Sequence, residues 1–238
     1  MKLCILGNSH IACIKHAWDN IAERYPGVDV VFFGSSANTL EHAKAEQGVL
    51  VPGTEQVARS WELTSGGSRE LAVERFDHVV VHGVLPFLTR WERLFRWVNK
   101  NQTASSAFVR DCFWRGHPLT HKVLAQVDQL DKSRILLTPR PSPVRQGEEV
   151  PLPEAGYREL ESFMASGFRA LGYRVRLQPL ASLTQGFHTF RRYNEDAIGL
   201  GKRPENLTRA PEGDRTHMNL AFGELYLDDL LSALDKEQ

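Results

Sequence analysis

Five short runs rich in apolar residues, separated by stretches with helical spacing, constrain the fold of this chain more than any other feature. The runs cover residues 2–6, 28–33, 78–82, 134–138 and 173–177. A strand that is apolar on both faces has to be covered on both faces, and sheets covered by helical crossovers are parallel. We therefore expect an α/β fold, a three-layer α/β/α sandwich with a mainly parallel five-stranded sheet in a flavodoxin-like strand order.

Between these runs, apolar residues recur three or four positions apart, as they do on the buried face of a helix. This spacing predicts helices within residues 11–25, 87–98, 160–171 and 220–234. A polar stretch after Gly34 is expected to cap a further helix. Two segments, residues 48–73 and 99–121, do not fit the alternation. We interpret both as insertions into one domain and expect the first to be a small antiparallel excursion.

Composition narrows the possible partners. Twenty-nine basic residues balance 29 acidic ones, so the chain has no net field that would favour nucleic acid or an anionic membrane surface. No stretch approaches the ~20 apolar residues of a membrane-spanning helix. The first apolar run is interrupted at Asn8, Ser9 and His10, too early for the core of a signal peptide. We expect a cytoplasmic protein that binds neither nucleic acid nor membranes.

Two polar motifs lie where the chemistry of such a fold is expected. Ser9 follows the first apolar run and precedes a helix, so its hydroxyl is expected at the carboxyl edge of the sheet and its N–H among the free donors of a helix N-terminus. Asp214 and His217 precede the last helix. A serine hydroxyl becomes a useful nucleophile when an imidazole takes its proton and a carboxylate orients that imidazole.

These motifs resemble those of the SGNH hydrolases, also called GDSL-like esterases. Residues 7–9 (Gly-Asn-Ser) match the Gly-Asp-Ser of that family's first block, and residues 214–217 match the Asp-x-x-His of its last block. The resemblance implies one SGNH-hydrolase-like domain over residues 1–238. In it, Ser9 would be the nucleophile, His217 the general base and Asp214 its orienting carboxylate. The N–H groups of Ser9 and Gly34, the second-block glycine, would bind the oxyanion.

The third block departs from the family pattern. Where the family has Gly-x-Asn-Asp, this chain has Gly-Val-Leu-Pro at residues 83–86, and Leu85 cannot donate the hydrogen bond of the asparagine. The loss of one such donor costs about 3 kcal/mol in the transition state. His82, Asn8 or a residue of the insertions would have to replace it.

Other polar residues near the predicted edge are weaker candidates. His10, His82 and Arg140 are predicted to contact the substrate, and Arg140 would suit an acidic or hydroxyl-rich one. Two histidine pairs have a spacing of four, but neither is accompanied by further ligands at a recognisable spacing, so we expect no metal. A serine hydrolase of this kind also needs no cofactor.

The sequence therefore predicts a serine esterase that acts on a small acyl ester, most simply an O-acetyl group on a carbohydrate or related metabolite. An acyltransferase with the same three residues is an alternative. A non-catalytic ligand-binding protein on the same fold is a second one, motivated by Leu85. A nucleotide-binding turn is disfavoured, because the first turn has neither Gly-x-Gly-x-x-Gly nor a P-loop lysine.

Overall fold

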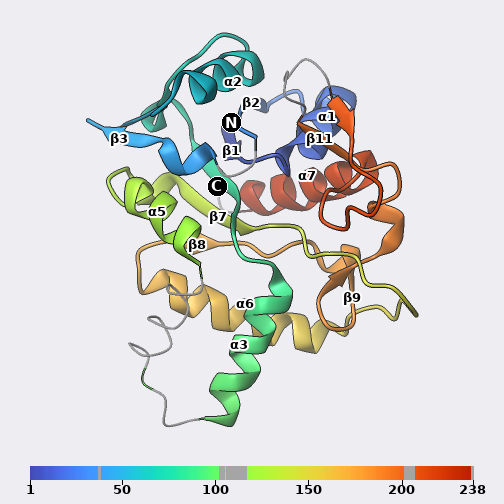
Figure 1. The fold of residues 1–238 in the computed structure, drawn as a ribbon. Coiled ribbons are helices and arrows are strands. Elements are labelled where there is room, and N and C mark those ends of the chain that lie inside the picture. The colour runs from blue at the N-terminus through green and yellow to red at the C-terminus, as the bar shows by residue number, and fades with distance from the viewer. Residues whose placement is uncertain (37–38, 102–104, 106–116, 201–206, 237–238) are drawn as a thin grey trace.

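A parallel sheet forms the centre of the protein. It consists of β1 (Lys2–Gly7), β2 (Asp29–Gly34), β6 (His78–Leu85), β7 (Ile135–Pro139) and β8 (Arg174–Val175). The computed structural model describes residues 1–36, 39–101, 105, 117–200 and 207–236. The strands pair in the order β2-β1-β6-β7-β8, and every pairing is parallel (Figure 1). This is the predicted flavodoxin-like order, in which the reversal next to β1 opens a crevice at the carboxyl ends of the strands.

Helices cover both faces of this sheet. They are α1 (Ile11–Ile21), α2 (Glu55–Ser65), α3 (Leu88–Lys100), α5 (Pro118–Val127), α6 (Glu154–Arg169) and α7 (Leu220–Asp235). Successive side chains of a strand point to opposite faces, so Leu3 and Ile5 join the core under α1 and α7. Cys4 and Leu6 join the core under the other four helices. The predicted three-layer α/β/α sandwich is confirmed.

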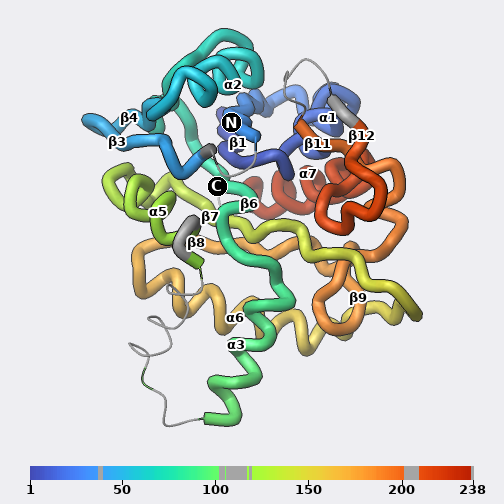
Figure 2. The backbone as a smooth tube through the Cα atoms, in the orientation of Figure 1, coloured from blue at the N-terminus to red at the C-terminus, as the bar shows by residue number. Residues whose placement is uncertain are grey.

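Helices α1 and α7, the blue and red helices of Figures 1 and 2, lie against each other although they come from opposite ends of the chain. Gly223 allows this close approach, because a Cβ atom there would lie 2.2 Å from the carbonyl oxygen of Cys13. Ser9 lies just before α1 and His217 just before α7. The contact between the two helices therefore sets how far apart these two side chains lie.

The segment 48–73 is only partly the predicted antiparallel excursion. β3 (Lys44–Glu46), β4 (Val49–Val51) and β5 (Leu71–Ala72) do form a small antiparallel sheet. Helix α2 lies between β4 and β5, begins where the Thr54 hydroxyl accepts the N–H of Val57, and ends at Gly66 with φ 79°. The helix expected directly after Gly34 does not form there; a 3-10 turn at Thr39–His42 and the β3–β4 hairpin come first.

The second predicted insertion, residues 99–121, lies mostly outside the described residues, between the end of α3 and the start of α5. Two hairpins, β9 (Leu183–Thr184) with β10 (His188–Thr189) and β11 (Ile198–Leu200) with β12 (Leu207–Arg209), were not predicted. Within the described ranges, every helix is too short or too polar to cross a bilayer.

Candidate active site

The turn between β1 and α1 holds Ser9 at the carboxyl edge of the sheet. The preceding residue, Asn8, is buried and fixes this turn from both ends of its amide. Its Oδ1 accepts the N–H of His10 at 3.1 Å, and its Nδ2 donates to the carbonyl of Gly83, at the end of β6, at 3.1 Å. Asn8 thus shapes the Ser9 turn and also ties it to the neighbouring strand.

Three predicted site residues from opposite ends of the chain form one hydrogen-bonded row. The Nε2 atom of His217 lies 2.9 Å from the hydroxyl of Ser9, and its Nδ1 atom lies 2.6 Å from Oδ2 of Asp214. With Asp214 ionised, Nδ1 carries the proton and Nε2 is free to accept the serine proton. We refer to these residues as the Ser9–His217–Asp214 row.

Backbone donors keep the carboxyl group of Asp214 ionised. Burial raises its pKa, but its Oδ1 accepts the N–H groups of His217 at 3.0 Å and Thr216 at 2.7 Å. Together with the His217 ring, these donors hold the pKa of Asp214 well below its usual range. A carboxylate fixed in this way can hold the imidazole in a single tautomer and orientation.

The imidazole of His217 is held between two further groups. The ring of His10 stacks on it, with the ring centroids 4.8 Å apart and the planes inclined by 24°. On β11, a Cβ atom at Gly199 would lie 3.5 Å from Cδ2 of His217, and Asn194 donates to the His217 carbonyl at 2.7 Å. His10 was predicted to line the site, whereas Gly199 and Asn194 lie in a segment without a recognisable sequence signal.

The groups that would bind an oxyanion are less complete. The N–H of Ser9 has no hydrogen-bond partner among the described residues and lies just before the start of α1. The N–H of Gly34, in contrast, donates to the Thr64 hydroxyl at 2.9 Å, and its carbonyl accepts from Ser60 at 2.7 Å. The prediction that Gly34 offers a free oxyanion donor is not supported, because α2 occupies this backbone group.

The third-block position offers no substitute donor from the predicted residues. Leu85 is fully buried in the core below α3 and α5. The Asn8 amide nitrogen donates to the Gly83 carbonyl, and its oxygen accepts the His10 N–H. His82 lies below the site, where Nδ1 contacts Thr138 Oγ1 at 2.8 Å and Tyr226 Oη at 3.1 Å, and Nε2 is buried without a partner. Burial lowers the pKa of His82 to about 3, so this ring is neutral.

Arg140 directly follows β7 and reaches back to the same edge. Its Nε donates to the carbonyl of Gly83 at 2.9 Å, the oxygen that also accepts from Asn8. Its backbone N–H donates to Leu85 at 3.0 Å. Burial lowers the pKa of Arg140, and the neighbouring charge of Arg90 lowers it further. The predicted contact residue therefore lies beside the Ser9 turn as a partly buried cation.

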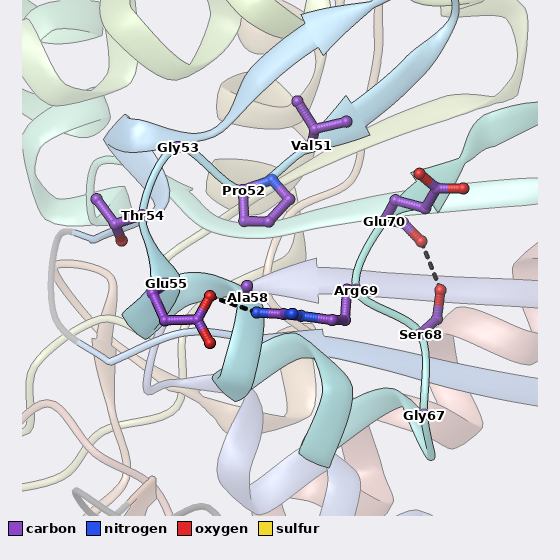
Figure 3. A pocket seen from close by; sticks show the side chains of 10 residues that line it. All are labelled: Val51, Pro52, Gly53, Thr54, Glu55, Ala58, Gly67, Ser68, Arg69 and Glu70. Carbon is purple, nitrogen blue, oxygen red and sulfur yellow. Dashed lines mark hydrogen bonds and ion pairs between the residues drawn. The ribbon is translucent and has the colours of Figure 1, made fainter.

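No three His, Cys, Asp or Glu side chains gather as a metal site within the part of the chain that the structure describes. A hollow of about 640 Å³ lies between the start of α2 and residues 67–70, and Ser9 does not line it (Figure 3). Glu55 and Arg69 form an ion pair there. None of the predicted site residues lines this hollow.

Comparisons with known proteins do not assign this chain to a family. A scan against models of known protein families gives no match, and a search of curated proteins finds no similar sequence. Membership of the SGNH hydrolases therefore stays a prediction. The function has to be inferred from the geometry around Ser9.

Proposed function

We propose that this protein is a serine esterase that hydrolyses a small acyl ester, such as an O-acetyl group on a carbohydrate or related metabolite. One observation carries the proposal: the Ser9–His217–Asp214 row, with distances of 2.9 and 2.6 Å between side chains 208 and three positions apart. Each of the three side chains has the hydrogen-bond partner that its role in acyl transfer requires.

In the proposed reaction, Ser9 Oγ attacks the ester carbonyl carbon while His217 Nε2 takes the hydroxyl proton. The tetrahedral intermediate collapses, its bond to the alcohol oxygen breaks, and His217 returns the proton to the leaving alcohol. Water then attacks the acyl-serine with His217 again as base, which releases the acid and restores Ser9. Asp214 stabilises the transient imidazolium without taking its proton.

The free N–H of Ser9 is the oxyanion donor that this geometry supports best. It belongs to the turn that begins α1, where unpaired N–H groups and the helix dipole favour negative charge. With Gly34 bonded to Thr64, a second backbone donor has to come from elsewhere. We therefore expect an enzyme that is slower than one with three donors, since each donor contributes about 3 kcal/mol.

A fluorophosphonate probe, followed by mass spectrometry, tests this proposal directly. We expect labelling at Ser9, hydrolysis of 4-nitrophenyl acetate by the wild type, and loss of both in Ser9→Ala. Ser133, the matched control, is an exposed serine in the turn before β7, and its alanine variant should keep both. Full acetate hydrolysis by Ser9→Ala would refute the proposal.

A non-catalytic binding protein is the second candidate, and the occupied N–H of Gly34 together with the apolar Leu85 favours it. It predicts ligand binding with no acyl-serine under any condition. An acyltransferase would form the acyl-serine but pass the acyl group to an added alcohol faster than to water. Product analysis with and without an acceptor alcohol distinguishes the three.

A further inference from the structure

Arg140 differs from Arg176, another partly buried arginine beside the sheet. The guanidinium of Arg176 is neutralised by Asp229, which accepts from Nε at 2.9 Å and from Nη2 at 2.6 Å. Arg140 has only the neutral Gly83 carbonyl as a side-chain partner in the described ranges, and no carboxylate pairs with it there. A partly buried cation without a counter-ion is unfavourable unless an anion binds to it.

The position of Arg140 relative to the nucleophile follows from their shared neighbour. Gly83 O accepts from Arg140 Nε on one side and from Asn8 Nδ2 on the other, and Asn8 directly precedes Ser9. The two Nη atoms of Arg140 form no hydrogen bond within the described residues. A group bound to them would lie beside the Ser9 turn.

A second cation extends this positive region. Arg90, near the start of α3, is exposed and forms no ion pair within the described ranges; its Nη1 donates to Nδ1 of His117 at 3.2 Å. Burial and then the charge of Arg90 lower the pKa of Arg140. The pKa of His10 is lowered by burial first, and then by His217, His82 and Arg140. Asp214, the acidic group that acts on His10, is already bound to His217.

We propose that Arg140, assisted by Arg90, binds an anionic group on the alcohol part of the substrate. The inference rests on the proposed esterase function, because an acetyl group itself carries no charge. A guanidinium presents parallel donors that match a carboxylate or a phosphate, and both anions share this chemistry. The substrate class is thus an acetyl ester of an acidic alcohol, such as an acidic sugar.

Two esters with nearly the same shape test this inference: 4-acetoxybenzoate, which carries a carboxylate, and its neutral methyl ester. Each kcat/KM is divided by the rate of the same ester with hydroxide, and the two quotients give a charge preference. We expect a preference of at least about 10-fold for the anion in the wild type, which 0.5 M salt lowers. The monoester 4-acetoxyphenyl phosphate shows whether carboxylate or phosphate is preferred.

Variants assign this preference to its residues. We expect Arg140→Gln to lower the charge preference about 10- to 100-fold, and Arg90→Gln to lower it less, because Arg90 is exposed. Arg140→Lys keeps the charge without the paired donors and should lie between. Arg59→Gln, an exposed arginine on α2, is the matched control and should leave the preference unchanged.

The outcomes separate this inference from the proposed function. If the wild type hydrolyses both esters without a charge preference, the esterase function stands and the inference is wrong. It is also wrong if Arg140→Gln and Arg90→Gln both keep the wild-type preference. If neither ester is hydrolysed, calorimetry with 4-hydroxybenzoate decides: binding to Ser9→Ala that is lost with Arg140→Gln supports an anion site, and no binding overturns it.

Discussion

The two sides of the Ser9 hydroxyl differ in how completely they are built. On the side of the proton acceptor, His217 is bonded to Ser9 and Asp214, stacked on His10 and held through its carbonyl by Asn194. On the side where the oxyanion would form, one backbone N–H is free. The N–H of Gly34 is engaged with α2.

This difference separates two tasks that serine hydrolases perform together. Moving a proton requires an ordered contact between side chains, which this fold provides through the row before α1 and α7. Stabilising the developing charge requires several donors aimed at one point, and here packing has taken two of those positions. The following experiments test whether the two sides differ in function as they do in geometry.

The largest effect is expected on the proton side. Asp214→Asn keeps the shape of the side chain but removes the charge that fixes the tautomer of His217, so kcat for an acetyl ester should fall about 10³- to 10⁴-fold. Glu212→Gln, an exposed change two positions away, should leave kcat unchanged. A decrease of less than 10-fold in Asp214→Asn would mean that the carboxylate does not orient the base.

The next largest effect concerns stability on the oxyanion side. Leu85→Asn introduces the amide that the family resemblance would require, but the side chain is fully buried among apolar residues. We expect a loss of about 3–5 kcal/mol in the free energy of unfolding, measured in urea, and no gain in kcat. Leu85→Met should cost far less. A Leu85→Asn variant with a higher kcat and unchanged stability would contradict the difference between the two sides.

Asn8 connects the two sides, so introducing a negative charge at this position should affect both. Asn8→Asp keeps the acceptor for the His10 N–H but places a carboxylate oxygen against the carbonyl of Gly83. We expect a loss of about 1–3 kcal/mol in the free energy of unfolding and a lower kcat. Denaturation at pH 7, together with kcat, checks this, and an unchanged stability would show that the link to Gly83 is unimportant.

Acid should lower the free energy of unfolding through His82, which lies below the site. Its pKa is lowered from 6.5 to about 3 by burial, so below pH 6.5 only the unfolded chain takes up this proton. Stability from this group is complete above pH 6.5 and falls towards pH 3 by at most about 1.4 kcal/mol per pH unit. Relative to His82→Gln, the wild type should lose about 2 kcal/mol between pH 6.5 and 5 in urea denaturation.

The smallest effect tests Gly34 itself. Thr64→Val removes the hydroxyl that accepts the Gly34 N–H and should cost about 1 kcal/mol of stability. Because the backbone of Gly34 stays in its strand, paired with Gly7, we expect kcat to remain within about 2-fold of the wild type. A 10-fold increase in kcat would instead identify Gly34 as a latent oxyanion donor, released when its partner is removed.

The sequence predicted the sheet because the apolar runs are long enough to exclude exposed strands. It also predicted which residues would meet, since Ser9 and His217 each lie at a point where the chain enters a helix at the carboxyl edge. The sequence did not indicate that the N–H of Gly34 is hydrogen-bonded, because its partner, Thr64, belongs to α2. That helix has recognisable signals in Thr54 and Gly66, but they lie in a segment that was interpreted as strands.

The support of the His217 ring was not predictable in the same way. Gly199 and Asn194 come from an irregular region with short strands, where no periodicity fixes which side chain faces the site. Likewise, the sequence suggested Arg140 as a contact residue, but its lack of an acidic partner is a property of the folded neighbourhood.

The glycine contact between α1 and α7 has a consequence for engineering. Because Gly223 lets the last helix pack directly on the first at Cys13, this contact sets the spacing of Ser9 and His217, and loops that contact neither residue's turn contribute little to it. Those loops are therefore open to exchange. New recognition segments grafted into them would change which molecules the protein selects, while the nucleophile and its base keep their alignment.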